Sequence, residues 1–240
     1  MENKELSIII PCYNGESTIL SVTKEIIKNI SSLNNSFEII IVDDASTDNT
    51  LNILKEMKHD LGIIYHTYAQ NMGKGYAVRK GIENSTGKFV LFTDADSDIS
   101  PNSIYKFIKS LEDYDVAIAS KIHADSIIDC TNSRKFLSNL FGLLARFLTN
   151  LKIKDSQVGF KIGNGDYMRK IFAIMTIDRY AFDVEFLVIA QLLGLKIIEL
   201  PIEMSLKRHF HLKDSFQMLI DLVKISYNIK IKKHYQKNLL

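Results

Sequence analysis

Apolar runs of strand length alternate with segments of helical pattern through the first half of the chain. The apolar runs lie at residues 6–10, 38–42, 63–67, 89–93 and 116–120. The segments between them, residues 17–32, 48–58, 71–84 and 101–112, carry helix-start signals and helical spacing. Nearly continuous apolar strands separated by helices predict an α/β fold, with a mostly parallel sheet covered by helices on both faces.

Polar residues gather where these predicted strands end. They are Pro11-Cys-Tyr-Asn, Asp43-Asp44, Asp94-Ala95-Asp96 and Ser120-Lys121. Because the carboxyl ends of parallel strands meet at one edge of a sheet, we expect the four groups to converge there.

Three carboxylates, Asp94, Asp96 and Asp98, follow the central apolar run directly. Carboxylates this close repel each other unless a cation lies between them, and hard oxygen ligands suit Mg²⁺ or Mn²⁺ carrying a phosphate substrate. The alternative is a solvated acidic turn that caps a helix beginning near Pro101.

Composition is that of an ordinary globular protein, with 46% hydrophobic and 24% charged residues in 240. Cys12 and Cys130 lie far apart, so no disulfide framework or zinc site is indicated, and a reduced cytoplasmic setting is expected. No signal peptide is expected before the first strand. Polar residues interrupt the most apolar helical stretch, 136–153, which excludes a membrane span there.

The net charge of +2 is unevenly distributed. Residues 207–240 hold eight Lys and Arg against Asp214 and Asp221, which leaves a net −4 for residues 1–206. A basic segment beside apolar residues indicates an anionic surface, either a membrane or nucleic acid. A solvated basic helix end that binds nothing is the alternative.

Two amphipathic helices are predicted in the second half, at residues 135–154 and 218–233. Either suits an interfacial helix that meets lipid, and the first suits core packing equally well. The second has flanking lysines, which favours the membrane.

The stretch Gly73-Lys74-Gly75 begins like a dinucleotide fingerprint. It follows the third strand instead of the first and has Val78 where the last glycine or alanine belongs, so nicotinamide binding is not supported. Lys74 and backbone amides near a helix start can still attract a phosphate.

Taken together, the motifs resemble family 2 glycosyltransferases with the GT-A fold, a Rossmann-like architecture. The first half matches through the strand-end groups, with Val42-Asp-Asp-Ala-Ser-Thr-Asp48 and Asn71-Met-Gly-Lys-Gly-Tyr-Ala77 in register. The second half resembles the polyprenyl-phosphate glycosyltransferases through four further stretches. These are Ser120-Lys-Ile-His123, Ser133-Arg-Lys-Phe-Leu-Ser-Asn139, Asp155-Ser-Gln-Val-Gly-Phe-Lys161 and Phe182-Asp-Val-Glu185.

The resemblance implies a nucleotide-sugar donor site and a metal site in the first half. Asp94, Asp96 and Asp98 would face Mg²⁺ or Mn²⁺ and the sugar diphosphate, where charge grows as the diphosphate leaves. The implied donor-binding residues are Pro11, Tyr13, Val42, Asp44, Lys74, Asp94, Ala95 and Asp96.

The acceptor that the resemblance implies is a lipid phosphate. Its oxygen is already anionic, so it needs cationic positioning and no strong base. Asp94, Asp96 and Arg134 would be the catalytic residues. The implied acceptor-phosphate residues are Lys121, Arg134, Ser138, Lys161 and Lys207.

Some positions depart from the commoner pattern of the group. Lys121 replaces an arginine, Gly15 precedes Glu16 where Glu is usual, and Asp98 replaces a glutamine. Arg binds phosphate through two parallel hydrogen bonds, whereas Lys acts as a point charge. Lys121 therefore leaves the donor and acceptor geometry open.

The sequence therefore predicts an inverting, metal-dependent enzyme that transfers a hexose from a UDP-glucose or GDP-mannose type of donor to a polyprenyl phosphate. One alternative is a hydroxyl acceptor with Asp183 or Glu185 as base; another is a non-catalytic nucleotide-sugar-binding protein. The expected organisation is a catalytic domain over 1–213, with donor half 1–121 and acceptor half 122–213, and a basic segment over 214–240. We expect a protein peripheral to the cytoplasmic face of a membrane or held by a membrane-anchored partner, without nucleic acid.

Overall fold

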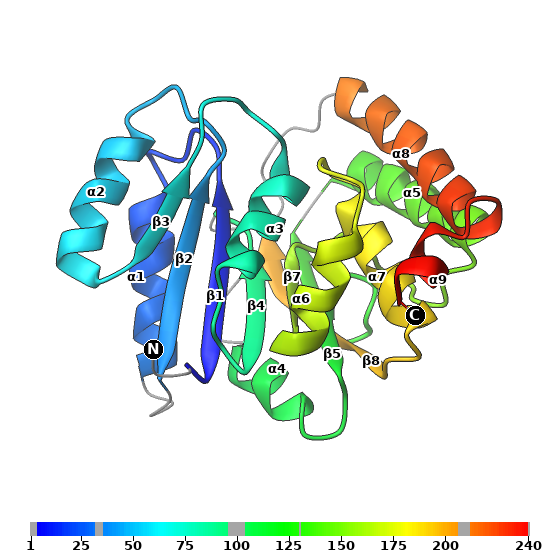
Figure 1. Ribbon diagram of the computed structural model, residues 1–240, viewed down its shortest axis with the longest axis horizontal. Coiled ribbons are helices and arrows are strands. Elements are labelled where there is room, and N and C mark those ends of the chain that lie inside the picture. The colour runs from blue at the N-terminus through cyan, green and yellow to red at the C-terminus, as the bar shows by residue number, and fades with distance from the viewer. Residues whose placement is uncertain (1–3, 32–35, 96–103, 130, 206–211, 240) are drawn as a thin grey trace.

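A seven-stranded sheet forms the centre of the computed structural model, which describes residues 4–31, 36–95, 104–129, 131–205 and 212–239 (Figure 1). The strand order is β3-β2-β1-β4-β7-β5-β8. The strands are β1 (Leu6–Cys12), β2 (Phe37–Asp43), β3 (Ile64–Thr67), β4 (Phe89–Thr93), β5 (Val116–Ser120), β7 (Phe160–Asn164) and β8 (Ile197–Pro201). The predicted α/β class is confirmed.

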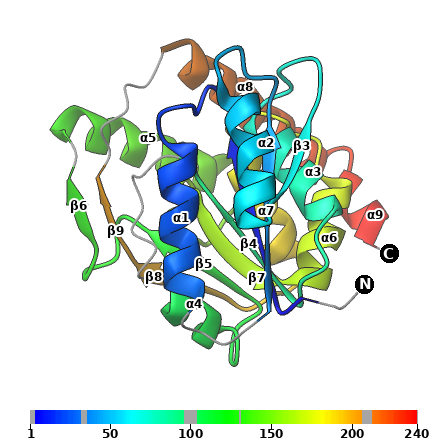
Figure 2. The same cartoon turned by 90° about the vertical axis from the view of Figure 1, so that its left-hand side faces the viewer.

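Helices cover both faces of this sheet, and Figure 2 shows α1 on one side and α3 and α6 on the other. One apolar cluster includes side chains of α1 (Ile19–Ile30), α2 (Thr50–Leu61) and α4 (Ile104–Ser110). The opposite cluster includes side chains of α3 (Lys74–Glu83), α6 (Gly165–Ile174) and α7 (Phe182–Leu192).

Strand β1 supplies both clusters because successive side chains point to opposite faces. Ile8 and Ile10 belong to the cluster under α1, whereas Ile9 belongs to the one under α3, and all three are fully buried. This burial on both faces explains why the strand is a continuous apolar run.

The sheet is parallel except at β7, which runs antiparallel to both β4 and β5. Thr93 at the end of β4 therefore pairs with Phe160 at the start of β7. A small parallel pair, β6 (Ile127–Asp129) with β9 (Glu203–Ser205), lies apart from the main sheet and was not predicted.

The strand order reverses direction between β1 and β4. The chain moves outward from β1 through β2 to β3 and then returns to the other side of β1 for β4. Ligands of open α/β sheets bind beyond the carboxyl ends of strands at such a switch point. Tyr13 and Asp94 follow these two strands, so the fold brings them to one location.

Three more helices extend the second half of the molecule: α5 (Asn132–Thr149), α8 (Leu212–Lys230) and α9 (His234–Leu239). Helix α5 ends earlier than predicted because Asn150 adopts a left-handed conformation, φ 57°, and its N–H closes the last turn on Arg146. Within the described ranges, no helix combines the length and apolar character needed to cross a membrane.

The segment 214–240 shares the core of the rest of the protein. Leu222 and Ile225 of α8 and Tyr235 of α9 are fully buried in the cluster that contains α7. The proposed division at residue 213 stays a prediction, but the segment packs as part of the same folded body.

Candidate active site

The loops after β1 and β2 are joined by hydrogen bonds at the sheet edge. The N–H of Asn14 donates to Ser46 Oγ at 2.8 Å, and Asn14 Oδ1 accepts from the N–H of Thr47 at 2.8 Å. Tyr13, the first residue after β1, is 44% exposed. Pro11 and Val42, its predicted companions at the donor site, are register partners whose side chains are buried.

Asp44 fixes the glycine-rich loop that precedes α3. Its carboxylate is 4% exposed and accepts the N–H of Met72 at 2.7 Å, the N–H of Gly73 at 2.9 Å and the hydroxyl of Tyr68 at 2.8 Å. Burial raises the pKa of Asp44, and these three donors oppose that rise. The carboxylate predicted to hold a nucleoside thus also sets the path of the loop that carries Lys74.

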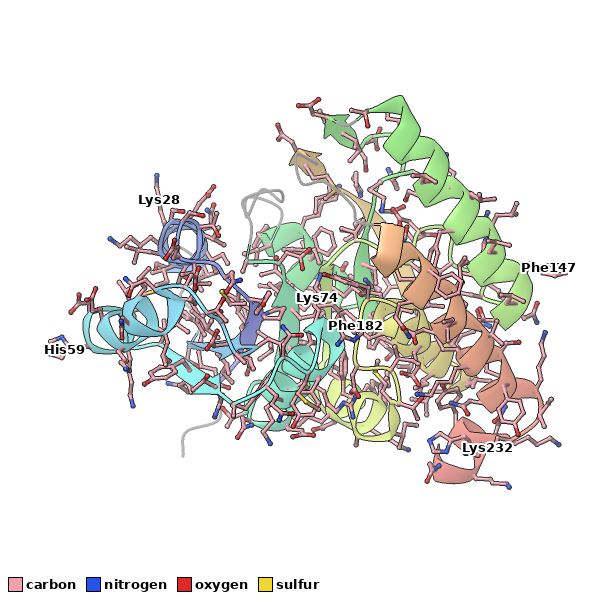
Figure 3. All side chains as sticks on the ribbon, turned by 90° about the horizontal axis from the view of Figure 1, so that it is seen from above. Lys28, His59, Lys74, Phe147, Phe182 and Lys232 are labelled. Atoms are coloured by element: carbon pink, nitrogen blue, oxygen red, sulfur yellow. The ribbon has the colours of Figure 1, made fainter. Side chains whose placement is uncertain are left out.

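Lys74 and Asp94 meet at the centre of this edge. The ammonium of Lys74, at the start of α3, forms an ion pair with Oδ1 of Asp94, just after β4. Figure 3 shows Lys74 beside Phe182 of α7, and its ammonium lies 6.0 Å from the centre of that ring. Both side chains of the ion pair are about one-quarter exposed, at 24% and 26%, so the pair is open to an incoming ligand.

The absence of a side chain at Gly159 leaves room for the Asp94 carboxylate. Because Thr93 pairs with Phe160, Gly159 lies opposite Asp94, and a Cβ added to Gly159 would come within 2.4 Å of Asp94 Oδ2. A side chain at position 159 would therefore displace the carboxylate.

The described part of the predicted metal site has a carboxylate that fits a hard divalent cation. Asp94 Oδ1 is buried and is paired with the Lys74 ammonium. Such an oxygen suits Mg²⁺ or Mn²⁺. Asp96 and Asp98, the other predicted ligands, lie outside the described residues, among which no group of three His, Cys, Asp or Glu side chains could hold a metal.

Lys161 and Asp183 form a buried ion pair close to this centre. Lys161 is 0% exposed, and its Nζ lies 2.5 Å from Asp183 Oδ1 and 2.5 Å from the carbonyl oxygen of Val158. Burial lowers the pKa of Lys161 and raises that of Asp183, while their mutual attraction opposes both shifts. The structure thus places this predicted acceptor-phosphate residue in the interior, with its amine bound to protein oxygens.

Two other predicted acceptor residues are brought together by Asp155. Lys121 Nζ lies 3.3 Å from Asp155 Oδ1, and the Lys121 N–H donates to Oδ2 at 2.6 Å. Asp155 Oδ1 also accepts the N–H of Gln157 at 3.1 Å, and Ser138 Oγ of α5 donates to Gln157 Oε1 at 3.0 Å. Lys121 and Ser138 thus share one polar network.

Two of the remaining predicted side chains, those of Lys207 and Arg134, lie outside the described part of the structure. Lys207 lies outside the described residues, and for Arg134 the structure describes the backbone, in α5, but not the side chain. Ala95 is half-buried directly after Asp94.

Glu185, a candidate base under the hydroxyl-acceptor alternative, is fully buried in α7. Its oxygens accept four hydrogen bonds from the N–H and Oγ1 of Thr176, the N–H of Ile177 and the hydroxyl of Tyr235, at 2.6–2.9 Å. These contacts commit the Glu185 carboxylate to holding the loop before α7 and give it a structural role.

Sequence reasoning missed the roles of Gly159, Asp155 and Glu185. Gly159 and Asp155 lie within the quoted stretch Asp155–Lys161, but only the antiparallel placement of β7 reveals what they touch. Glu185 contacts Tyr235 fifty residues away, and no local pattern signals that pairing.

Comparison with known proteins identifies the family to which this chain belongs. The sequence model described as "Glycosyl transferase family 2" matches residues 7–172. The chain therefore belongs to glycosyl transferase family 2 and is a glycosyltransferase that uses a nucleotide sugar.

Within that class, several similar curated proteins are described as "Dolichyl-phosphate beta-glucosyltransferase". The Dictyostelium discoideum protein is 34% identical, over 95% of this chain and 75% of its own length. The Saccharomyces cerevisiae protein is 33% identical, over 91% and 73%. The predicted resemblance to the polyprenyl-phosphate group is confirmed at the level of family.

A solved structure of similar fold is glucosyl-3-phosphoglycerate synthase from Mycobacterium tuberculosis in complex with Mn²⁺, UDP and glucosyl-3-phosphoglycerate. It superposes with a TM-score of 0.69 at 19% identity, over 94% of this chain and 79% of that one. The same enzyme with Mg²⁺ and UDP gives a TM-score of 0.68 at 18% identity. At this identity the match shows the fold alone, which confirms the GT-A expectation.

Proposed function

We propose that this protein transfers glucose from UDP-glucose to a polyprenyl phosphate of the dolichyl type, with inversion. A phosphate oxygen of the lipid attacks the anomeric carbon as the bond from that carbon to the UDP oxygen breaks. UDP leaves with the bonding electrons, and the product is a β-linked lipid phosphoglucose. Every atom of the two substrates is then accounted for in two products.

The observation that carries the proposal is the pair of polar clusters at the sheet edge. Lys74 and Asp94 lie at the switch point, whereas Lys121 and Ser138 share a separate network around Asp155. Cations and hydroxyls suit a phosphate acceptor, which needs positioning and no base. The names of the similar curated proteins support glucose and dolichyl phosphate, and UDP in the similar fold supports the nucleotide.

Asp94, with Asp96 and Asp98, would hold the divalent metal that this proposal includes. Bound there, the metal would neutralise the negative charge that grows on the departing diphosphate. The Mn²⁺ and Mg²⁺ complexes of the similar fold support this choice of ion.

A hydroxyl acceptor is the competing proposal, and both of its predicted candidate bases are bound to other protein groups. Glu185 is enclosed by four hydrogen bonds, and Asp183 is bound to Lys161 in the interior. The phosphate acceptor fits both facts.

The acceptor proposal predicts the effect of Arg134→Ala. Loss of a charge-assisted contact should weaken use of the lipid phosphate by roughly 10- to 100-fold, while UDP binding measured by calorimetry stays unchanged. Lys170→Ala, which removes an exposed cation from α6, serves as the matched control and should behave like the wild type. Equal transfer to dolichol and dolichyl phosphate by the wild type would instead support the hydroxyl acceptor.

We further propose that α5 and α8 meet the cytoplasmic face of a membrane. These helices lie side by side, and Ser226 of α8 donates to the Leu148 carbonyl of α5 at 2.9 Å (Figures 1 and 3). Each helix has a second, exposed apolar stripe. On α5 it comprises Leu137, Leu140, Leu143 and Phe147, and on α8 Phe216, Leu219, Ile220, Val223 and Tyr227.

Charge supports a lipid surface as the partner of these stripes. Helix α5 contains no acidic residue, and Lys135, Lys224, Lys230 and Lys232 are exposed on the two helices and just beyond α8. Apolar stripes with basic flanks suit the interface of an anionic bilayer.

The membrane proposal predicts that Phe147→Asp reduces sedimentation with anionic vesicles. Phe147 is 81% exposed at the outer end of α5, so the change places a charge in the apolar surface without disturbing the core (Figure 3). We expect a roughly 10- to 100-fold loss of binding, since burying one aromatic side chain stabilises association by about 1.5–3 kcal/mol. Tyr105→Asp on α4, where the ring is 60% exposed, is the matched control. Equal loss in both variants would contradict the assigned surface.

A further inference from the structure

The loop between α6 and α7, residues 175–181, packs directly against the glycine-rich loop that carries Lys74. The N–H of Tyr76 donates to the Asp178 carbonyl at 3.0 Å, and Arg79 forms an ion pair with the Asp178 carboxylate. A Cβ added to Gly73 would lie 2.6 Å from the Asp178 carbonyl oxygen, and one added to Gly75 would lie 2.9 Å from the Ile177 oxygen. The two loops therefore touch backbone to backbone.

Arg179 extends from this loop over the glycine-rich one. An added Cβ on Gly73 would lie 2.9 Å from Arg179 Cγ, which fixes the start of the arginine side chain beside the loop that Asp44 anchors. Arg179 is exposed. Its backbone carbonyl accepts the N–H of Phe182 at 3.3 Å, but within the described residues its guanidinium forms neither a hydrogen bond nor an ion pair. Its positive charge is near enough to Asp44 to counter, in part, the rise in the pKa of Asp44 that burial causes.

Glu185 holds the α6–α7 loop in place from the opposite side. Its oxygens accept the N–H groups of Thr176 and Ile177, and the Tyr235 hydroxyl donates to the same carboxylate at 2.6 Å. Two successive backbone amides bound to one buried carboxylate leave the loop little freedom. The exposed Arg179 side chain therefore extends from a backbone loop that is held in place.

We propose that Arg179 binds a phosphate oxygen of the donor's nucleoside diphosphate, next to Lys74. This inference rests on the proposed function, because it assigns a residue to the donor of that reaction. A diphosphate carries negative charge into an edge that already holds Asp44 and Asp94, so it requires cations besides Lys74, which is paired with Asp94. A guanidinium can donate hydrogen bonds to two phosphate oxygens at the same time. The alternative is an exposed arginine that only water contacts.

Calorimetry with uridine, UMP and UDP, each with Mg²⁺, tests the assignment. Arg179→Gln should weaken UDP binding by 10-fold or more, weaken UMP less, and leave uridine unchanged, because the lost contact is to phosphate. Lys170→Gln removes an exposed cation from α6 and should bind all three ligands like the wild type. Arg179→Lys, which keeps the charge but not the fork, should restore part of the UDP affinity.

Other outcomes overturn the proposal in distinguishable ways. If Arg179→Gln binds UDP as the wild type does, Arg179 is not a donor residue and the proposed function stands. If uridine, UMP and UDP weaken equally, the variant has disturbed the pocket and the phosphate contact is wrong. A wild-type protein that binds neither UDP nor UDP-glucose overturns the proposed function and this inference with it.

A second variant tests whether the hydrogen bonds of Glu185 hold the α6–α7 loop in position. Tyr235→Phe removes one donor from Glu185 without changing the packed volume, and it lies away from the donor edge, on α9. If Glu185 positions Arg179 through the loop, UDP should bind about 3- to 10-fold more weakly while uridine binding stays the same. Unchanged UDP affinity in Tyr235→Phe would remove this positioning role from the network and leave Arg179 to be judged by its own variant.

Discussion

Replacing Asp94 by Asn should reduce glucosyl transfer by about 10²- to 10³-fold, the loss typical when electrostatic stabilisation of a developing charge is removed. The substitution keeps the shape of the side chain but removes its negative charge from Lys74 and from any bound metal. Initial rates with UDP-glucose, dolichyl phosphate and Mg²⁺ or Mn²⁺ would measure it. The far-ultraviolet circular dichroism of the variant should match that of the wild type.

Asp166→Asn is the matched control for this experiment. Asp166 is an exposed carboxylate in the first turn of α6, where it pairs with Arg169 on the surface. Its loss should leave transfer within twofold, since surface pairs contribute about 0–1 kcal/mol. Full activity of Asp94→Asn, unaffected by a chelator, would remove Asp94 and the metal from the mechanism.

Gly159→Ala offers an independent route to the same carboxylate. Its added methyl group would meet both oxygens of Asp94, so the carboxylate must move or β7 must shift. We expect a loss of transfer in the same direction as Asp94→Asn, with the charge still present. That result would separate the position of the carboxylate from its charge.

The sequence predicted the first five strands, because each is a local apolar run, but it did not predict β6, β7, β8 or β9. The switch point between β1 and β4 depends on the strand order, which was not predicted. The antiparallel direction of β7 was not predictable, since no short-range pattern fixes how a strand enters a sheet built from distant residues. The role of Gly159 was hidden for the same reason.

Sequence motifs and charge alone also did not show which charged residues and segments are buried in the folded protein. Lys161 was assigned to the acceptor phosphate because it matches a motif, yet its amine is enclosed by Asp183 and the Val158 carbonyl. The basic segment 214–240 looked separable because its charge differs from the body. Its apolar residues Leu222, Ile225 and Tyr235 complete the core beside α7, and their burial depends on contacts that only the folded chain makes.

Because the Lys161 amine is buried against Asp183, its removal should change the stability of the protein. Lys161→Met should lower the free energy of unfolding by about 3–5 kcal/mol, because it leaves the Asp183 carboxylate buried without its partner. Urea denaturation measures this change. Lys170→Met, on the exposed side of α6, is the control and should unfold like the wild type within about 0.5 kcal/mol.

The double variant Lys161→Met/Asp183→Ala separates a structural ion pair from a phosphate-binding lysine. With both charges gone, no uncompensated charge remains in the interior, so much of the stability lost in Lys161→Met should return. The single variants and the double variant form a cycle whose coupling energy we expect to exceed about 1 kcal/mol for groups in direct contact. A phosphate-binding role predicts the opposite: Lys161→Met would unfold at the wild-type urea concentration, its apparent affinity for the lipid phosphate would fall, and Asp183→Ala would not rescue it. That pattern would require the buried amine to reach an acceptor and would overturn the structural role assigned to the pair.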